Sequence, residues 1–337
     1  MRAILTTLFV LCLTSTNRQL IADPVSVPPT TLMLVVGAPG EDEYQPIFEE
    51  SAAAWAGAAK LAGAKSVKIG ADEVDGNPPR IQLESALKSA TNSPADLWLV
   101  FVGHGTYDGR DAKFNLHGPD VSASELSTWL EPLNRRVVIF QGASASAPFI
   151  NRLSNSGRII ITATRSGNEQ NYARFGRHAA EALVSPQTDI DQDGQNSALE
   201  IFLAAARLTA DWYKNEGRLA TEHPLIDDNG DARGTPADWF QGLRVVKRAG
   251  DGSQPDGLRA RQVHLVPSAD EARLTVEQRQ WRDGKELELS RLRDRRTAMS
   301  EEEYFGALEE LLLELARFYA AVEAGTNPVP AGNPATN

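Results

Sequence analysis

The sequence predicts an α/β protein, in which a doubly wound, mainly parallel β-sheet is covered by helices and followed by a C-terminal helical hairpin. Two short apolar segments, 96–103 and 136–142, are rich in β-branched and aromatic residues, as is typical of strands buried on both faces of a parallel sheet. Strand-like and helix-like segments alternate from residue 32 to 213, which indicates βαβ units and five or more strands. After Pro267 the composition changes to Glu, Arg and Leu at helical spacing, which predicts a separate extension.

Each predicted element follows from its own pattern. Short apolar runs that end at Gly or at a polar turn predict strands at 32–36, 66–70, 96–103, 136–142 and 157–163. Apolar residues at intervals of three and four predict helices at 46–62, 79–89, 125–130, 179–184 and 199–213. Ser122 and Glu125 have the spacing of a capping box at the start of the third helix. Segment 108–120 is predicted to be a polar loop, and no structure is predicted for 214–265.

The chain divides into four regions: a signal peptide at 1–22, an α/β domain at 23–265, a helical extension at 266–325 and a disordered tail at 326–337. The first region has a basic residue, Arg2, before an apolar core at 3–13 that is too short to span a bilayer. A buried N-terminal helix is the alternative. With a signal peptide we expect a secreted or periplasmic protein without a transmembrane anchor.

The helical extension carries two predicted capping boxes, Ser268–Glu271 and Ser300–Glu303, and therefore two helices. An apolar stripe runs along the second helix at helical spacing. Its members are Phe305, Leu308, Leu312, Leu315, Tyr319 and Val322. Such a stripe packs against the α/β domain, pairs with a second copy of the chain, or binds a protein partner, so 268–324 is a candidate surface for a partner or for self-association.

Net charge and cysteine usage exclude some functions. The net charge of −11 argues against nucleic-acid binding, because nucleic-acid binders usually present a basic face. Cys12 is the only cysteine, and it lies within the predicted signal peptide. The mature chain would then have neither a disulfide nor a thiolate nucleophile.

Two chemically capable side chains follow the two most apolar strands. His104-Gly105 follows the strand at 96–103, and Ser144 follows the strand at 136–142. Because the ligand crevice of such sheets lies beyond the carboxyl ends of the strands, we expect His104 and Ser144 on the same rim.

The segments Val102-Gly-His104-Gly105, Lys113–Asp120 and Ala143-Ser144-Ala-Ser146 resemble the caspase–haemoglobinase fold, and more narrowly the bacterial relatives of legumain-type cysteine peptidases. In that family a His-Gly pair ends one strand and an Ala-Cys-x-Ser-Gly segment ends the next. The resemblance implies that His104 is the catalytic histidine, that Ser144 stands in place of the nucleophilic Cys, and that the Gly105 and Ser144 N–H groups form the oxyanion hole. Residues 222–231, which include His223, also resemble these relatives and could border the cleft.

The exchange of Cys for Ser alters the expected chemistry. A serine hydroxyl is a far weaker acid than a thiol, so it needs a nearby base and a group that orients this base. The sequence offers only Asp108 as a candidate for the orienting group. We therefore expect a peptidase homologue that retains its cleft for binding a peptide or protein ligand without catalysis. The alternatives are a peptide-bond hydrolase that uses Ser144 and His104, and an interaction protein that acts through its C-terminal helices.

A second candidate site is the acidic loop at 189–200. Asp189, Asp191 and Asp193 alternate before Gly194, and Glu200 stands at position 12, as in calcium-binding loops. Gln195 would contribute its backbone carbonyl. The pattern predicts a structural calcium ion, and the alternative is a polar turn followed by an ordinary capping box formed by Ser197 and Glu200.

Overall fold

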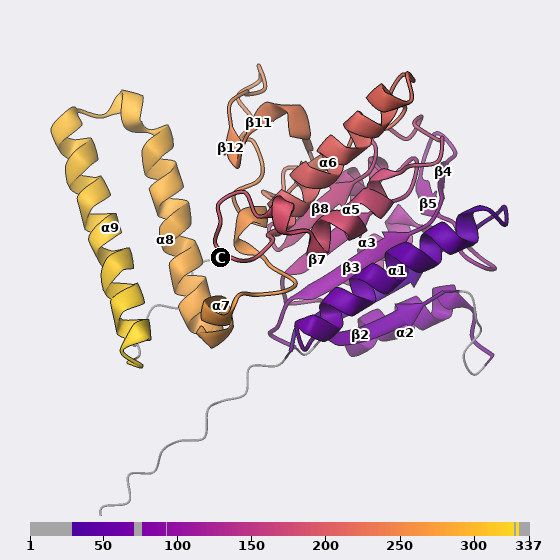
Figure 1. Ribbon diagram of the computed structural model, residues 1–337, viewed down its shortest axis with the longest axis horizontal. Coiled ribbons are helices and arrows are strands. Elements are labelled where there is room, and N and C mark those ends of the chain that lie inside the picture. The colour runs from indigo at the N-terminus through magenta and orange to yellow at the C-terminus, as the bar shows by residue number, and fades with distance from the viewer. Residues whose placement is uncertain (1–28, 71–75, 92, 327, 330–337) are drawn as a thin grey trace, which may run out of the picture.

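The computed structural model describes residues 29–70, 76–91, 93–326 and 328–329. The predicted signal peptide at 1–22 lies outside these ranges, as does most of the predicted tail. A helical hairpin projects from the α/β part (Figure 1), and side chains of Arg136 and Gln262 in the α/β part contact Asp283 and Glu286 of the hairpin. No helix among the described residues is long and apolar enough to cross a membrane.

A seven-stranded sheet with the order β10-β9-β8-β7-β3-β1-β2 forms the centre of the α/β part. Strands β8, β7, β3, β1 and β2 run parallel, while β9 pairs antiparallel with β8, and β10 with β9. The strands are β1 (Thr31–Val36), β2 (Lys65–Ile69), β3 (Leu97–Val102), β7 (Val137–Gln141), β8 (Arg158–Thr162), β9 (Leu225–Asp227) and β10 (Thr235–Pro236). The predicted mainly parallel α/β sheet is confirmed.

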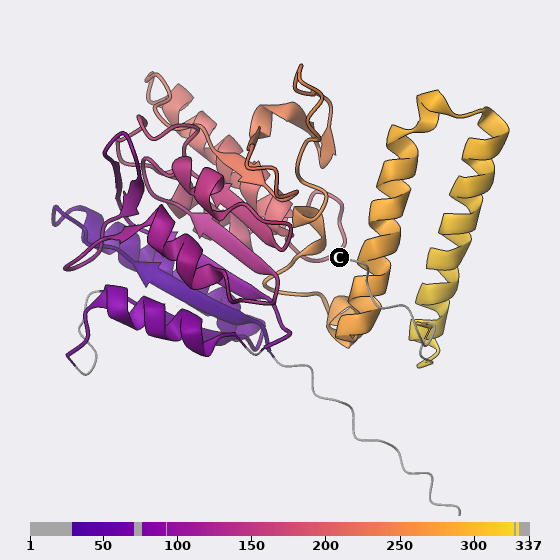
Figure 2. The same ribbon diagram turned by 180° about the vertical axis from the view of Figure 1, so that it is seen from behind.

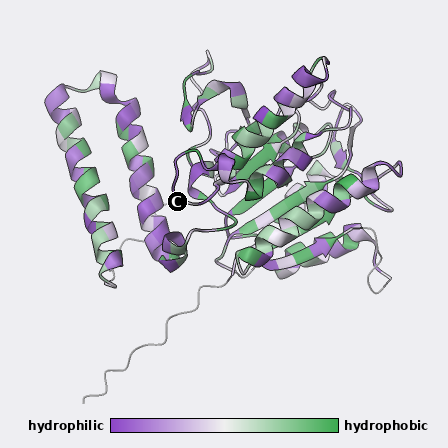
Figure 3. Ribbon diagram, in the orientation of Figure 1, coloured by the Kyte–Doolittle hydropathy of each residue, from purple (hydrophilic) through white to green (hydrophobic). Residues whose placement is uncertain are grey.

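Helices cover both faces of this sheet and make three layers (Figures 1 and 2). Side chains of β1 alternate between two apolar clusters, with Leu32 and Leu34 in one and Met33 and Val35 in the other. The first cluster includes residues of α1 (Tyr44–Leu61), α5 (Phe175–Val184) and α6 (Ala198–Asn215). The second includes residues of α2 (Pro79–Ser89), α3 (Ala123–Leu130) and α4 (Pro148–Leu153). The central strands are apolar throughout because both of their faces are buried, and Figure 3 shows them as the most hydrophobic part of the ribbon.

Two parts of the α/β region differ from the sequence prediction. Segment 108–120 contains β5 (Ala112–Phe114), which pairs with β4 (Gly105–Tyr107) and β6 (Val121–Ser122) in a small antiparallel sheet. This sheet is stabilised by Phe114, which is fully buried against Phe101. Helix α4 is likewise not predicted. Strands and helices this short carry too few residues to show a period.

The segment 214–265, for which no structure is predicted, contains β9 and β10 and several shorter elements. These are the β11 (Phe240–Gln241) and β12 (Arg244–Val245) pair and the 3-10 helices η2 (Ala237–Trp239) and η3 (Ala260–Gln262). A further 3-10 helix, η1 (Pro186–Thr188), precedes the acidic loop.

The C-terminal extension is a helical hairpin, but its first long helix begins later than predicted. Ser268 caps only the short α7 (Ala269–Arg273), and the Glu271 carboxylate pairs with Arg282 instead of completing a capping box. The long helix α8 (Val276–Asp294) starts at a Thr275–Gln278 capping box. After η4 (Arg296–Ala298), α9 (Glu301–Glu323) begins at the predicted Ser300–Glu303 box.

Candidate functional site

The sheet topology brings the two predicted site residues to one edge. Strands β3 and β7 are adjacent and parallel, with Phe101 opposite Gln141. Both therefore end on the same side of the molecule, and His104 and Ser144 follow these ends directly. The prediction that the two residues share a rim agrees with this topology.

The Ser144 hydroxyl is bound to both polar groups of the Gly105 backbone. It accepts a hydrogen bond from the Gly105 N–H at 3.2 Å and donates one to the Gly105 carbonyl at 3.0 Å. The side chain is buried, with 3% of its surface exposed. A Cβ on Gly105 would lie 2.4 Å from the Ser144 carbonyl oxygen, so the two strand ends can approach this closely only because residue 105 is a glycine. The hydroxyl thus joins the ends of β3 and β7.

The His104 ring is held by a backbone carbonyl and by aromatic rings. Its Nε2 lies 3.0 Å from the Pro39 carbonyl oxygen, and because a carbonyl can only accept, Nε2 carries the proton. Neutral His104 therefore presents Nδ1 as its acceptor. The rings of Tyr44, Phe48 and Tyr172 surround the imidazole, with centroids 4.7, 5.2 and 5.7 Å away. Burial lowers the pKa of His104, which favours the neutral form.

The group that orients His104 is the backbone carbonyl of Pro39, which the sequence did not predict. Asp108, the only candidate found there, accepts hydrogen bonds from the Arg110 and Asp111 N–H groups and lies 3.8 Å from the Lys113 ammonium. It organises the turn between β4 and β5. The Pro39 carbonyl orients the imidazole instead, and a backbone carbonyl carries no signal in the residue type.

The loop after Ser144 is fixed in a conformation that is unusual for its residues. Ala145 has a φ of 54°, in the left-handed region, and its N–H donates to the Glu169 carbonyl at 2.8 Å. The Ser146 hydroxyl is fully buried and accepts from the Ala163 and Thr164 N–H groups. Backbone strain of this kind persists only where the surrounding structure over-determines it. The loop is therefore preorganised against the end of β8.

A second histidine lies near the same loop. His223 Nδ1 is 2.6 Å from Glu169 Oε1, and its backbone N–H donates to Glu169 Oε2. Glu169 also accepts from the Arg165 N–H and forms an ion pair with its guanidinium at 3.3 Å. Since the Glu169 carbonyl holds Ala145, this cluster borders the Ser144 loop.

These contacts define what the rim can do. The described residues contain no hydrogen bond between His104 and Ser144, and the Ser144 proton points to the Gly105 carbonyl. The Gly105 N–H, one of the two expected oxyanion donors, is bound to Ser144 Oγ. A nucleophile needs a base within hydrogen-bond reach, and this arrangement holds the hydroxyl away from that role.

The acidic loop brings together part of its predicted calcium ligands. Carboxylate oxygens of Asp189, Asp191 and Asp193 lie within 4.8 Å of one another. The Glu200 carboxylate is buried, and it accepts hydrogen bonds from the Ser197 N–H and hydroxyl and from the Ile190 N–H. The predicted alternative, a capping box at Ser197, is thus present.

The fifth predicted ligand residue, Gln195, uses its side chain within the loop and beyond it. Its amide donates to Asp193 at 2.9 Å and accepts from the Ser268 N–H at 2.8 Å. Asp191 also forms an ion pair with Arg261 at 3.0 Å. Of the predicted ligand residues, Asp189, Asp191 and Asp193 are therefore the ones whose carboxylates lie close enough together to share one ion.

Caspases are among the solved structures that resemble this chain. Caspase-1 from Spodoptera frugiperda is 9% identical with a TM-score of 0.39, over 60% of this chain and 87% of that one. The Drosophila initiator caspase Dronc is 11% identical with a TM-score of 0.37, over 61% of this chain and 81% of that one. No protein-family profile matches the chain, and no curated protein sequence matches it.

Proposed function

We propose that this protein is a secreted or periplasmic relative of the legumain-type peptidases that binds a peptide or protein ligand at the His104–Ser144 rim without cleaving it. The proposal rests on the hydrogen bonding of the Ser144 hydroxyl. It is buried, and both of its hydrogen bonds are made with Gly105. The sequence of residues 1–22 supports export, and the motifs around His104 and Ser144 support the relation to legumain-type peptidases.

Physical chemistry favours binding over turnover. An unactivated serine hydroxyl is a poor nucleophile, and here it would have to break its bond to the Gly105 carbonyl before it could donate to His104. The rim nevertheless has the rigid, partly apolar character of a binding site, because Tyr44 and Tyr172 pack around His104 and the following loop is preorganised.

The test compares wild type with Ser144→Cys and Ser144→Ala, using a mixed library of synthetic peptides read by mass spectrometry. We expect no cleavage by wild type or by Ser144→Ala. Ser144→Cys supplies a nucleophile that ionises near neutral pH, so we expect it to gain cleavage that a further His104→Ala change abolishes. Cleavage by wild type that Ser144→Ala removes would replace the proposal with the serine-hydrolase alternative.

Ligand binding is measured separately on wild type, as protection from amide hydrogen exchange by the same peptide library at saturating concentration. We expect protection at residues 103–107 and 144–147, and its loss in Tyr172→Ala. The exposed Lys60→Ala change, on α1, serves as the matched control. Protection confined to other parts of the chain would contradict a binding role for the rim.

A further inference from the structure

The strongest surface feature outside the rim is the outer side of α9. The hairpin projects from the α/β part, with α8 nearer to it and α9 on the far side (Figures 1 and 2). The inner side of α9 is packed on α8, where Phe318 is buried and stacks on Trp281 at 4.8 Å. Lys285 on α8 also forms an ion pair with Glu314 at 2.9 Å. The hairpin is therefore held together by one side of α9 alone.

The side of α9 that does not pack on α8 exposes large apolar residues. Phe305, Leu312 and Leu313 expose 52%, 46% and 46% of their surfaces, whereas Tyr319 interacts with Arg282 of α8 and belongs to the inner side of α9. Residues seven apart drift by only about 20° around a helix, so Phe305 and Leu312 form one row. A row of this spacing is typical of a helix–helix contact. Figure 3 shows α9 as the more hydrophobic of the two hairpin helices.

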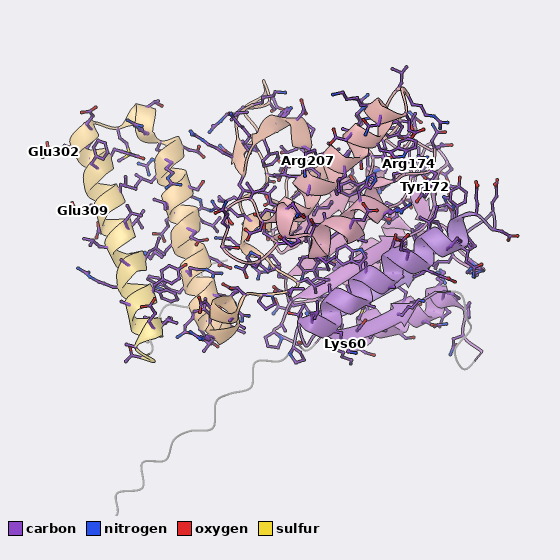
Figure 4. All side chains as sticks on the ribbon, in the orientation of Figure 1. Lys60, Tyr172, Arg174, Arg207, Glu302 and Glu309 are labelled. Carbon is purple, nitrogen blue, oxygen red and sulfur yellow. The ribbon has the colours of Figure 1, made fainter. Side chains whose placement is uncertain are left out.

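Acidic residues line one edge of this apolar row. Glu302 and Glu309 are exposed and lie about 40–60° around the helix from Phe305, on the side away from α8. Figure 4 labels both on the outer side of α9. Neither forms an ion pair with any residue of the described chain. Helix α9 as a whole carries seven glutamates and one arginine, so its outer face combines apolar area with uncompensated negative charge.

We propose that this outer face of α9 binds an amphipathic helix of a protein partner whose apolar stripe is flanked by Lys and Arg. The apolar row supplies the area, and the Glu302–Glu309 edge selects basic residues through charge complementarity. A second copy of the chain fits this face poorly, because two α9 helices of the same negative charge would be brought together. The proposed interaction is independent of the His104–Ser144 rim.

Two synthetic helical peptides with the same leucine stripe test the proposal, one with lysines and the other with glutamates at its flanking positions. Binding to the full chain is measured by fluorescence anisotropy at low and at high salt. We expect the lysine peptide to bind at least about tenfold more tightly at low salt, and high salt to reduce this preference. Equal affinities, or tighter binding of the glutamate peptide, would overturn the proposal.

Surface variants locate the binding. Leu312→Ser is expected to weaken binding of the lysine peptide by at least about tenfold, because the variant lacks the leucine side chain that wild type buries on binding. Glu302→Lys with Glu309→Lys is expected to reverse the preference toward the glutamate peptide. Leu61→Ser, at an apolar residue of α1 that is 77% exposed, is the matched control and should leave binding unchanged. Unchanged binding in Leu312→Ser would place the peptide elsewhere and refute the proposal.

The oligomeric state tests the remaining alternative, in which a second copy of the chain covers the outer face of α9. Sedimentation of the full chain without peptide is expected to show a monomer over a wide concentration range. A dimer that Leu312→Ser dissociates would show that a second copy covers this face and would overturn the proposed partner. Melting curves of each variant verify folding, and because Leu312 and both glutamates are exposed, little change in stability is expected.

Discussion

At the scale of single residues, the rim is built from small side chains that let backbones approach. Because Gly105 has no side chain, the Ser144 carbonyl can pack closely against it. The Ser144 hydroxyl forms hydrogen bonds with both polar groups of the Gly105 backbone. Ser146 does the same for the end of β8, where it accepts two N–H groups. The hydroxyls at positions 144 and 146 therefore stabilise the junction of three strands, a role that needs no catalysis.

The strain at Ala145 gives a prediction about stability. A non-glycine residue at φ 54° costs about 1–2 kcal/mol, which glycine avoids, although glycine loses more entropy on folding. We expect Ala145→Gly to raise the free energy of unfolding by about 0.5–1 kcal/mol, measured by urea denaturation. Ala147→Gly is the matched control, because Ala147 has a φ of −52° and should lose stability. A loss of stability in Ala145→Gly would show that the left-handed backbone carries no strain.

At the scale of elements, the acidic loop connects η1 to α6. Asp189 accepts the Asp193 and Gly194 N–H groups, and Gly194 takes the positive φ that the turn requires. Glu200 closes the capping box of α6. The loop is thus well ordered by its own hydrogen bonds, while it concentrates three carboxylates with Arg261 as the cation beside Asp191.

We predict that calcium stabilises this loop and with it the fold. An ion that binds only the native state raises the melting temperature. Once the ion concentration exceeds the dissociation constant, this increase grows with the logarithm of the concentration. We expect millimolar calcium to raise the melting temperature of wild type, and a chelator to lower it. Asp189→Asn with Asp193→Asn should remove the response, and the exposed Asp211→Asn on α6 should retain it. A melting temperature indifferent to both calcium and chelator would refute the calcium site.

At the scale of the whole molecule, buried carboxylates connect segments that are distant in sequence. Asp256 accepts from the Asp228 and Asn229 N–H groups and from the Thr235 hydroxyl, and Asp228 accepts from the Arg259 N–H. Burial, and next the charge of Asp228, raise the pKa of Asp256 to about 8. The folded protein thus holds a proton that the unfolded chain releases near pH 4.

This raised pKa predicts that stability falls as pH rises. Between about pH 4 and 8 the native state binds more protons than the unfolded chain, so the free energy of unfolding decreases with pH by up to about 1.4 kcal/mol per unit. Burial also lowers the pKa of His104, and that of His178 and His264 to about 4, so these histidines act in the opposite sense, and their effect fades as the pH rises above about 6.5. Over the window from pH 6.5 to 8 the carboxylate effect is therefore the larger one.

Urea denaturation of wild type and Asp256→Asn across this window provides the measurement. An asparagine can keep the hydrogen bonds without titrating, so we expect a flatter pH dependence in Asp256→Asn. The exposed Asp251→Asn change should retain the wild-type slope. A wild-type stability that stays constant or rises from pH 6.5 to 8 would contradict the raised pKa.

The amino-acid sequence determined the architecture and the location of the rim. Buried parallel strands are apolar throughout, and such runs at 96–103 and 136–142 are long enough to show this in sequence alone. Parallel strands end at one edge, so the order of residues along the chain suffices to place His104 and Ser144 together. The capping boxes at Ser122 and Ser300 also form as predicted, because capping depends on residues only three positions apart.

Tertiary structure alone decided the chemistry at the rim. The orientation of the His104 ring depends on the Pro39 carbonyl, and the orientation of the Ser144 hydroxyl depends on the Gly105 backbone. Backbone contacts of this kind cannot be read from the residue types. The small β4–β5–β6 sheet and the Glu169–His223 pair join residues that lie far apart in sequence or in short strands without a readable period. Local patterns specify elements, but contacts between elements decide which polar groups remain free to react.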